Sequence, residues 1–163
     1  MHRSENLFRR ARLEGLLDIL REIAVRLPVR FVLHPVTRRR LETLGLIDRV
    51  AAMPGVSLVA RMDFFRFIGM VRNAAVVLTD GGSNQEECAM LGVPCVLLRR
   101  ATERRDGLDS NVVISGYDRG VVMGAVEHAL QASRQTRTLD AHSPSRVVVE
   151  RLAASFESAS GRR

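Results

Sequence analysis

The chain has 163 residues, of which 46% are hydrophobic and 26% charged, and its mean hydropathy is zero. These values predict one globular domain with a buried core and exclude a disordered, collagen-like or disulfide-scaffold protein. The net charge is +7 and all 25 basic side chains are arginines, which excludes chemistry that needs a lysine in this chain, such as a phosphate-loop lysine or a Schiff base.

The first predicted element is a helix in which apolar residues recur at helical spacing from Leu13 to Leu27. Ser4 or Asn6 is the expected cap of this helix, and Pro28 is expected to stop it. Short apolar runs and amphipathic segments then alternate. In chain order they predict a strand at 29–33, a helix at 37–44, a strand at 56–60, a helix at 64–71, a strand at 74–79, a helix at 83–91, strands at 95–98 and 112–115, and helices at 121–130 and 144–156.

The predicted strands are continuous apolar runs separated by helices, and Gly45 and Gly92 follow two of those helices as expected C-caps. This pattern is typical of a parallel sheet covered on both faces. We therefore predict an α/β, doubly wound domain over residues 1–157 and a frayed tail at 158–163. The chain opens with a helix, where units of this kind normally open with a strand.

Several partner classes are not expected. No apolar run approaches the ~20 residues that cross a bilayer and no signal-peptide pattern opens the chain, so we expect a cytoplasmic protein without a membrane partner. Cys88 and Cys95 lack a second pair at metal-ligand or redox spacing, so we expect no metal. The arginines are scattered, with one Tyr and no Trp in the chain, which argues against nucleic acid.

Residues 79–87 are the strongest local candidate for a site. They follow a buried strand, and ligands of open parallel sheets bind at the carboxyl ends of strands. Gly81 and Gly82 let the backbone approach a ligand, and the following helix start can hold a phosphate. Ser83 and Glu86 also have the spacing of a capping box, which needs no ligand, so both interpretations stay open. The polar residues Gln85 and Glu87 favour a site.

Residues 99–107 follow the next strand along the sequence and open at the same edge. Their guanidinium groups would give charge-assisted contacts to an anion, although a solvated charge run is the common alternative. His2 and His34 are further candidates, the latter at the carboxyl end of a strand. From composition alone, we interpret both histidines as structural or surface residues.

Seven short motifs follow one another along the chain from His2 to Gly107, within a resemblance that extends to about residue 132. They are His2-Arg3-x-Glu5-Asn6; Arg12-Leu13-Glu14; His34-Pro35-x-Thr37-Arg38; Asp63-Phe64 with Phe67; Thr79-Asp80-Gly81-Gly82 with Gln85-Glu86-Glu87; Leu91-Gly92-Val93-Pro94; and Leu98-Arg99 with Thr102-Glu103-Arg104 and Gly107. Together they resemble the carboxyl-terminal, nucleotide-binding domain of the non-hydrolysing UDP-N-acetylglucosamine 2-epimerases. In that family two Rossmann-like domains form a glycosyltransferase-B-type fold.

The resemblance implies a role for individual positions. It makes His2 the catalytic histidine that faces the UDP-sugar and Phe67 part of the uracil pocket. Gly82 and Ser83 match the helix start that holds the diphosphate, and Glu87 matches the glutamate that binds the ribose hydroxyls. Further residues of the matching motifs are candidates for the nucleotide site: Arg104 first, then Arg3, Asn6, His34, Gln85 and Glu103.

The family reaction eliminates UDP from UDP-N-acetylglucosamine and returns it with inversion at C2, which makes the enzyme an isomerase of polysaccharide synthesis. Stabilising the departing UDP is work for helix N–H groups and arginines, so the resemblance implies no cofactor and no metal. Homodimers are common in the family. Where the family has Asp-Ser-Gly-Gly, this chain has Asp80-Gly81-Gly82-Ser83, a displaced serine that changes the phosphate contacts.

The family's amino-terminal domain, which carries the acidic residues that move the C2 proton, has no counterpart in this sequence, nor has the strand that should run into His2. We therefore expect a UDP-binding half that is inactive alone and lacks its first strand, leaving a gap between the strands at 29–33 and 74–79 unless these close up. The alternatives are a nucleotide-sugar module of a related glycosyltransferase-type protein in surface polysaccharide synthesis, working with a partner chain, and a basic protein without nucleotide affinity.

Overall fold

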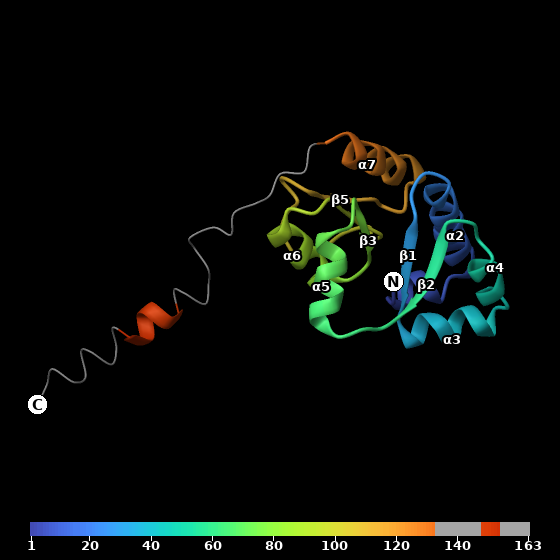
Figure 1. Ribbon diagram of the computed structural model, residues 1–163, viewed down its shortest axis with the longest axis horizontal. Coiled ribbons are helices and arrows are strands. Elements are labelled where there is room, and N and C mark those ends of the chain that lie inside the picture. Colours follow the sequence, from blue (N-terminus) through green and yellow to red (C-terminus); the bar gives the residue numbers. More distant parts are fainter. Residues whose placement is uncertain (133–147, 154–163) are drawn as a thin grey trace, which may run out of the picture.

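A computed structural model describes residues 1–132 and 148–153 of the chain. Its elements are α1 (Ser4–Leu7), α2 (Arg10–Ala24), β1 (Val29–Leu33), α3 (Pro35–Thr43), α4 (Ile47–Ala51), β2 (Val56–Ala60), α5 (Phe64–Arg72), β3 (Val77–Thr79), α6 (Gly82–Leu91), β4 (Cys95–Leu97), β5 (Val112–Ile114) and α7 (Arg119–Gln131) (Figure 1). All five predicted strands are present. Residues 148–153 are helical within the predicted helix 144–156, whose remainder lies outside the described residues, as do residues 154–157 of the predicted domain and the tail at 158–163.

The strands form two separate parallel sheets. β1 pairs with β2 in register from Val29 opposite Val56, and β3, β4 and β5 form the second sheet in that order. Figure 1 shows β1 and β3 as the neighbouring strands of the two sheets. The gap expected between them is therefore confirmed, and the strands have not closed up.

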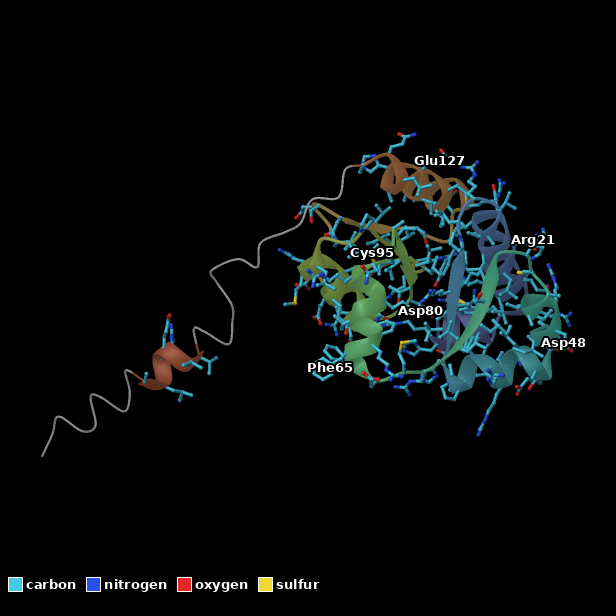
Figure 2. The ribbon with its side chains drawn as sticks, viewed as in Figure 1. Arg21, Asp48, Phe65, Asp80, Cys95 and Glu127 are labelled. Atoms are coloured by element: carbon cyan, nitrogen blue, oxygen red, sulfur yellow. The ribbon has the colours of Figure 1, made fainter. Side chains whose placement is uncertain are left out.

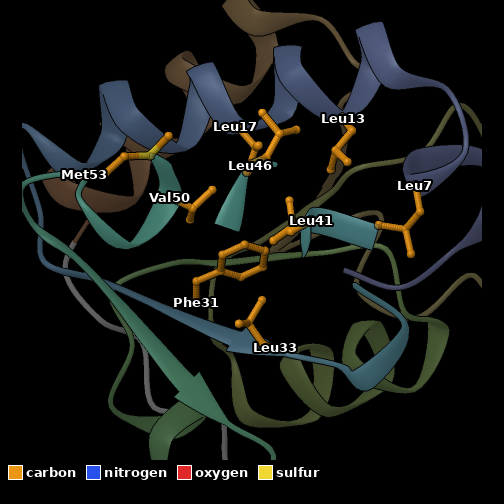
Figure 3. Close-up of a cluster of buried hydrophobic side chains, with 9 residues drawn as sticks. All are labelled: Leu7, Leu13, Leu17, Phe31, Leu33, Leu41, Leu46, Val50 and Met53. Carbon is orange, nitrogen blue, oxygen red and sulfur yellow. The ribbon is translucent and has the colours of Figure 1, made fainter. Parts of the chain in front are cut away.

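Helix α2 packs against both sheets because its apolar residues occupy two faces. Leu13 and Leu17, one turn apart, join Phe31 and Leu33 of β1 in the first core cluster (Figure 3). Other members of that cluster come from α3, α4 and the turns beside them: Leu41, Leu46, Val50 and Met53. The second face of α2, with Leu16, Ile19 and Ile23, packs with β4 and α7 in a second cluster.

The sheet of β3, β4 and β5 is covered on both faces, as its continuous apolar strands predict. Leu78 and Val96 point to the face covered by α2 and α7, while Val77, Cys95 and Leu97 belong to the cluster on the opposite face, under α5 and α6. The two cysteines are buried and form no disulfide with one another. The hydrogen bond to Cys88, followed by burial, raises the pKa of the Cys95 thiol.

Two predicted caps are wrong. The first long helix begins at Arg10, with Arg9 as its N-cap and no side-chain cap, because Ser4 and Asn6 lie in the separate helix α1. The capping box is also wrong: Gly81 is the N-cap of α6, so Ser83 is the second helical residue and Glu86 stands too far along to complete the box. Gly92 does end α6, with φ 65° in the left-handed region that glycine tolerates.

Between the two sheets lies a cleft of about 860 Å³, which we call the inter-sheet cleft. It is bordered by residues of β1 and β3 and by residues of α2 and α5, among them Val32, Leu78, Leu20 and Met70. Its lining is mainly apolar. The cleft reaches the carboxyl ends of the strands, where Thr79 and Asn84 line it.

Candidate functional site

Asp80, directly after β3, is the centre of the candidate site, and Figure 2 shows it in the middle of the molecule. Its fully buried carboxylate accepts hydrogen bonds of 2.9 Å from the backbone N–H groups of His2 and Arg3 and from Nδ2 of Asn6. The α-amino nitrogen of Met1 lies 3.8 Å from Oδ1. Burial alone would raise the pKa of Asp80, but the Met1 ammonium and these N–H donors outweigh it and lower that pKa below its ordinary value. A buried carboxylate thus holds the amino-terminal segment against β3.

The side chains of His2 and His34 lie next to one another, and His2 lies next to the Asp80 carboxylate. Nδ1 of His2 lies 3.4 Å from Asp80 Oδ1, and the His2 side chain is 48% exposed. The His2 and His34 rings are tilted by 31° with centroids 5.1 Å apart. Nδ1 of His34 accepts from the N–H of Val36 at 3.3 Å and caps α3, so the proton of neutral His34 sits on Nε2. Burial, followed by the charges of His2 and Arg61, lowers the pKa of His34.

The Arg104 side chain lies against the first residue of α6, Gly82. A Cβ atom at Gly82 would lie 3.1 Å from Cδ and Cζ of Arg104, so glycine is needed for the guanidinium to lie this close. Nη1 of Arg104 pairs with Glu86. Nε of Arg104 is buried, makes no hydrogen bond to the residues that the structure describes, and lies 3.7 Å from Glu103 Oε1. A hydrogen-bond donor therefore remains unused beside the free N–H groups of a helix start.

Gln85 positions the loop that carries this arginine. The Gln85 side chain is fully buried, and its Nε2 donates to the carbonyl oxygens of Arg104 and Asp106 at 3.1 and 3.0 Å. Its Oε1 accepts from the hydroxyl of Thr102 at 2.8 Å. The predicted polar group at the mouth of the site thus lies below the surface, where it holds loop 99–107 against α6.

Three charged side chains connect this loop to the amino-terminal segment. Buried Arg99 donates to Glu103 at 2.8 Å, and Arg3 lies 4.0 Å from the same carboxylate. Hydrogen bonds from its own backbone and from Arg99 lower the pKa of Glu103. Arg104 Nε also lies 3.7 Å from Glu103, so Arg3, Glu103 and Arg104 lie together at this edge.

Glu87 is held in place through Asn84. Asn84 Nδ2 donates to Glu87 Oε2 at 3.0 Å, and its Oδ1 accepts from the Thr79 hydroxyl at 3.0 Å. The same hydroxyl accepts from the N–H of Gly81 at 3.0 Å. Ser83, the displaced serine, is exposed on the first turn of α6. The loop is thus ordered by Thr79 and Asn84 and leaves both Ser83 and Glu87 at the surface of the helix.

Phe67 lies apart from the Asp80 cluster. It projects from α5, whose N-cap Asp63 accepts from the N–H of Arg66 at 3.0 Å. Phe67 is half-buried, packs against the third core cluster and lines the inter-sheet cleft together with Asn84. An aromatic wall and the start of α6 therefore border one continuous cleft.

Three residues have parts in the site that the sequence did not indicate. Asp80 stood in a matching motif without an assigned role. The Thr37 hydroxyl hydrogen-bonds the carbonyl of Met1. Tyr117, which follows β5 with φ 69°, stacks on the Arg12 guanidinium 4.1 Å away. Each follows a predicted strand directly or within one helical turn, and that position is the signal that could have found them.

Residues 1–132 and 148–153 contain neither a candidate metal site nor a candidate membrane-spanning helix. No group of three or more His, Cys, Asp or Glu side chains is placed to hold a metal ion. Within the same residues, no helix combines the length and apolar character needed to cross a bilayer.

A family model described as UDP-N-acetylglucosamine 2-epimerase matches residues 1–146. The chain belongs to the UDP-N-acetylglucosamine 2-epimerase family. A curated UDP-N-acetylglucosamine 2-epimerase from Methanococcus maripaludis is 32% identical over 137 residues, which are 82% of this chain and 37% of that protein. A UDP-2,3-diacetamido-2,3-dideoxy-D-glucuronate 2-epimerase from Pseudomonas aeruginosa is 34% identical over 104 residues, 63% of this chain and 28% of that protein.

Solved structures of this epimerase family match the fold. The UDP-GlcNAc 2-epimerase of Methanocaldococcus jannaschii superposes with a TM-score of 0.83 at 28% identity, over 93% of this chain and 44% of that one. A second structure of that protein, in complex with UDP-GlcNAc and UDP, gives a TM-score of 0.81 at 28% identity over 94% and 43% of the two chains. The predicted family and the Rossmann-like, glycosyltransferase-B-type fold are confirmed. The chain spans less than half the length of these epimerases.

Proposed function

We propose that this domain binds the uridine diphosphate portion of UDP-N-acetylglucosamine. The observation that carries the proposal is Arg104, which lies across the start of α6 at Gly82 with its Nε buried and without a hydrogen-bond partner among the described residues. Helix N–H groups and a guanidinium are both donors that anions seek, and together they suit a diphosphate. The related M. jannaschii epimerase, whose structure contains UDP-GlcNAc and UDP, supports the same ligand.

Within this proposal the nucleotide lies along α6 and the cleft. The N–H groups at Gly82 and Ser83 and the Arg104 guanidinium hold the diphosphate. Glu87, fixed by Asn84, accepts hydrogen bonds from the ribose hydroxyls. The uracil ring packs against Phe67 at the cleft wall.

His2 would act where the sugar joins the diphosphate. Its Nδ1 lies next to Asp80, which leaves Nε2 as the ring nitrogen available to a ligand. Charge that develops on the departing UDP would be stabilised by Arg104 and the α6 N–H groups. We further propose that the domain does not epimerise alone, because the matched epimerases contain more than twice its length.

The test is a calorimetric titration of the chain with UDP. Arg104→Ala is expected to raise the Kd for UDP about 10- to 100-fold, because the variant loses a charged hydrogen bond to the diphosphate. Arg105→Ala is the matched control, because Arg105 lies in the same loop and is exposed. Equal binding by the two variants would contradict the proposed site. Absence of binding by the wild-type chain would contradict the proposal itself.

The sugar is the least constrained part of this ligand, since the similar P. aeruginosa protein is named for a different UDP-sugar. Titrations with UDP, UDP-N-acetylglucosamine and a UDP-diacetamido uronate separate the alternatives. Tighter binding of UDP-N-acetylglucosamine than of the uronate supports the proposal. The reverse order would contradict it and would indicate that the UDP-diacetamido uronate is the ligand of this domain.

A further inference from the structure

Gly81 has a backbone conformation that does not require glycine. Its φ of −87° and ψ of 132° lie in the extended region that any residue adopts. The space around it is what excludes a side chain. A Cβ atom at this position would lie 3.4 Å from Oγ1 of Thr79 and only 2.7 Å from Oδ1 of Asn84, closer than Cβ atoms come to other heavy atoms in folded proteins. The Asn84 side chain therefore excludes a larger residue at position 81 as long as it keeps its place.

Asn84 is held in that place at both ends of its side-chain amide. The Thr79 hydroxyl accepts from the N–H of Gly81 at 3.0 Å and donates its own proton to Asn84 Oδ1, also at 3.0 Å. Because Oδ1 is the acceptor in that bond, Nδ2 is left to donate to Glu87 Oε2, at 3.0 Å. These three side chains form a directed chain of hydrogen bonds, which we call the Thr79–Asn84–Glu87 relay.

The relay begins at a fixed point and ends at a side chain that is partly open to solvent. Thr79 is 5% exposed, is the last residue of β3, and accepts from the N–H of Leu98 at 2.8 Å through its carbonyl oxygen. Glu87 is half-buried on α6. A glutamate that is free to rotate loses conformational freedom when it binds a ligand, and one that is already oriented loses less. Asn84 thus connects the Glu87 carboxylate to the rigid end of a strand.

The relay also lies at the cleft. Thr79 and Asn84 line the inter-sheet cleft together with Phe67. Asn84 stands two residues after Gly82, against which the Arg104 side chain lies. A nucleotide that reaches from the start of α6 to Phe67 therefore passes the relay, and the ribose is the part of a nucleotide that joins the diphosphate to the base.

We infer that Asn84 is the positioning residue for ribose recognition, and that its side chain is the reason for glycine at position 81. The inference rests on the proposed binding of UDP. Through Asn84, the Glu87 carboxylate is oriented to accept hydrogen bonds from the ribose hydroxyls before the nucleotide arrives. A ligand without these hydroxyls gains nothing from the oriented carboxylate, so the domain should select ribonucleotides.

The test is a set of calorimetric titrations with UDP, with dideoxy-UDP, in which the ribose lacks both hydroxyl groups, and with inorganic pyrophosphate. The wild-type chain is expected to bind UDP about 10-fold more tightly than dideoxy-UDP. Asn84→Ala removes the relay, and Gly81→Ala displaces Asn84 from it, so each should lower this preference to about 2-fold or less. Their Kd for pyrophosphate should not change, which also shows that the variants are folded. Gly124→Ala is the matched control, because a Cβ atom there meets nothing within 4 Å.

The double variant decides whether position 81 acts through Asn84. When Asn84 is already alanine, Gly81→Ala has no side chain to displace and should change the ribose preference less than about 2-fold further. Full preference in Asn84→Ala would overturn the inference, and so would weaker pyrophosphate binding in Gly81→Ala with an unchanged ribose preference. A wild-type chain that binds UDP and dideoxy-UDP equally would contradict this inference and leave the diphosphate site standing. A wild-type chain that binds no UDP would contradict the proposed function and this inference together.

Discussion

Asn6 and Asp80, both fully buried, are joined by a hydrogen bond of 2.9 Å although 74 positions separate them in sequence. Asn6 also donates to the carbonyl of Leu98, at the end of β4, at 3.1 Å. The pair thus connects the amino-terminal segment to the loops after two strands. His2 and Arg3 are bound to the same Asp80 carboxylate, so this pair also sets where the proposed sugar-facing histidine begins.

Asp80→Ala is expected to lower the free energy of unfolding by about 2–4 kcal/mol, because the N–H groups of His2 and Arg3 and the Asn6 amide lose a buried acceptor. Urea denaturation measures the change. Asp109→Ala is the control, since Asp109 is an exposed acidic residue. Equal urea midpoints for the two variants would show that Asp80 does not hold the segment.

Acid should destabilise the fold in a step that belongs to His34. Its folded pKa lies below the ordinary value of 6.5, so the unfolded chain binds the proton more tightly. The contribution of His34 is therefore fully present above pH 6.5 and is lost as the pH falls through the lower, folded pKa.

His34→Asn keeps an N-cap for α3 but removes the titration. Unfolding free energies measured between pH 7 and 5 should fall less steeply for this variant than for the wild-type chain. Parallel curves for the two proteins would count against the assignment.

Asp80 should produce a second step at lower pH. Its folded pKa lies below the ordinary value of 3.8, so its contribution is present above that value and is lost as the pH falls through the folded pKa. Asp80→Asn removes this step and leaves the His34 step in place. An unchanged acid midpoint in Asp80→Asn would indicate that other carboxylates cause acid unfolding.

Glu87→Gln should separate ribose from diphosphate recognition. The variant keeps an acceptor for Asn84 but loses the charge proposed to bind two hydroxyls, so the Kd for UDP should rise about 10-fold. The Kd for inorganic pyrophosphate should stay the same, whereas Arg104→Ala should weaken both ligands. If Glu87→Gln weakens pyrophosphate equally, Glu87 acts on the helix start and not on the ribose.

Local pattern was enough to predict the five strands and most helices, because each apolar run is bounded by polar residues, glycine or proline. It was also enough to predict that residues 79–87 and 99–107 meet, since parallel strands end at one edge of a sheet. Short α4 was missed because only Val50 of its five residues is buried, which leaves no periodic pattern to detect.

The partners of the buried polar residues in the site could not be predicted, because sequence spacing does not show which distant residues they contact. Gln85 and Asp80 are both polar residues of one loop-and-helix segment and both are fully buried, but Gln85 binds loop 99–107 whereas Asp80 binds the amino-terminal segment. The predicted capping box at Ser83 is wrong because the N-cap of α6 is Gly81, two positions earlier. Sequence spacing alone does not decide which of these two small residues becomes the cap.

The most direct test of the nucleotide site is a backbone amide spectrum of the chain titrated with UDP. We expect the largest shifts on the amides of Gly81, Gly82 and Ser83, with smaller shifts in loop 99–107, and we expect Arg104→Ala to remove them at the same UDP concentration. Shifts confined to other parts of the chain, or their persistence in Arg104→Ala, would contradict it.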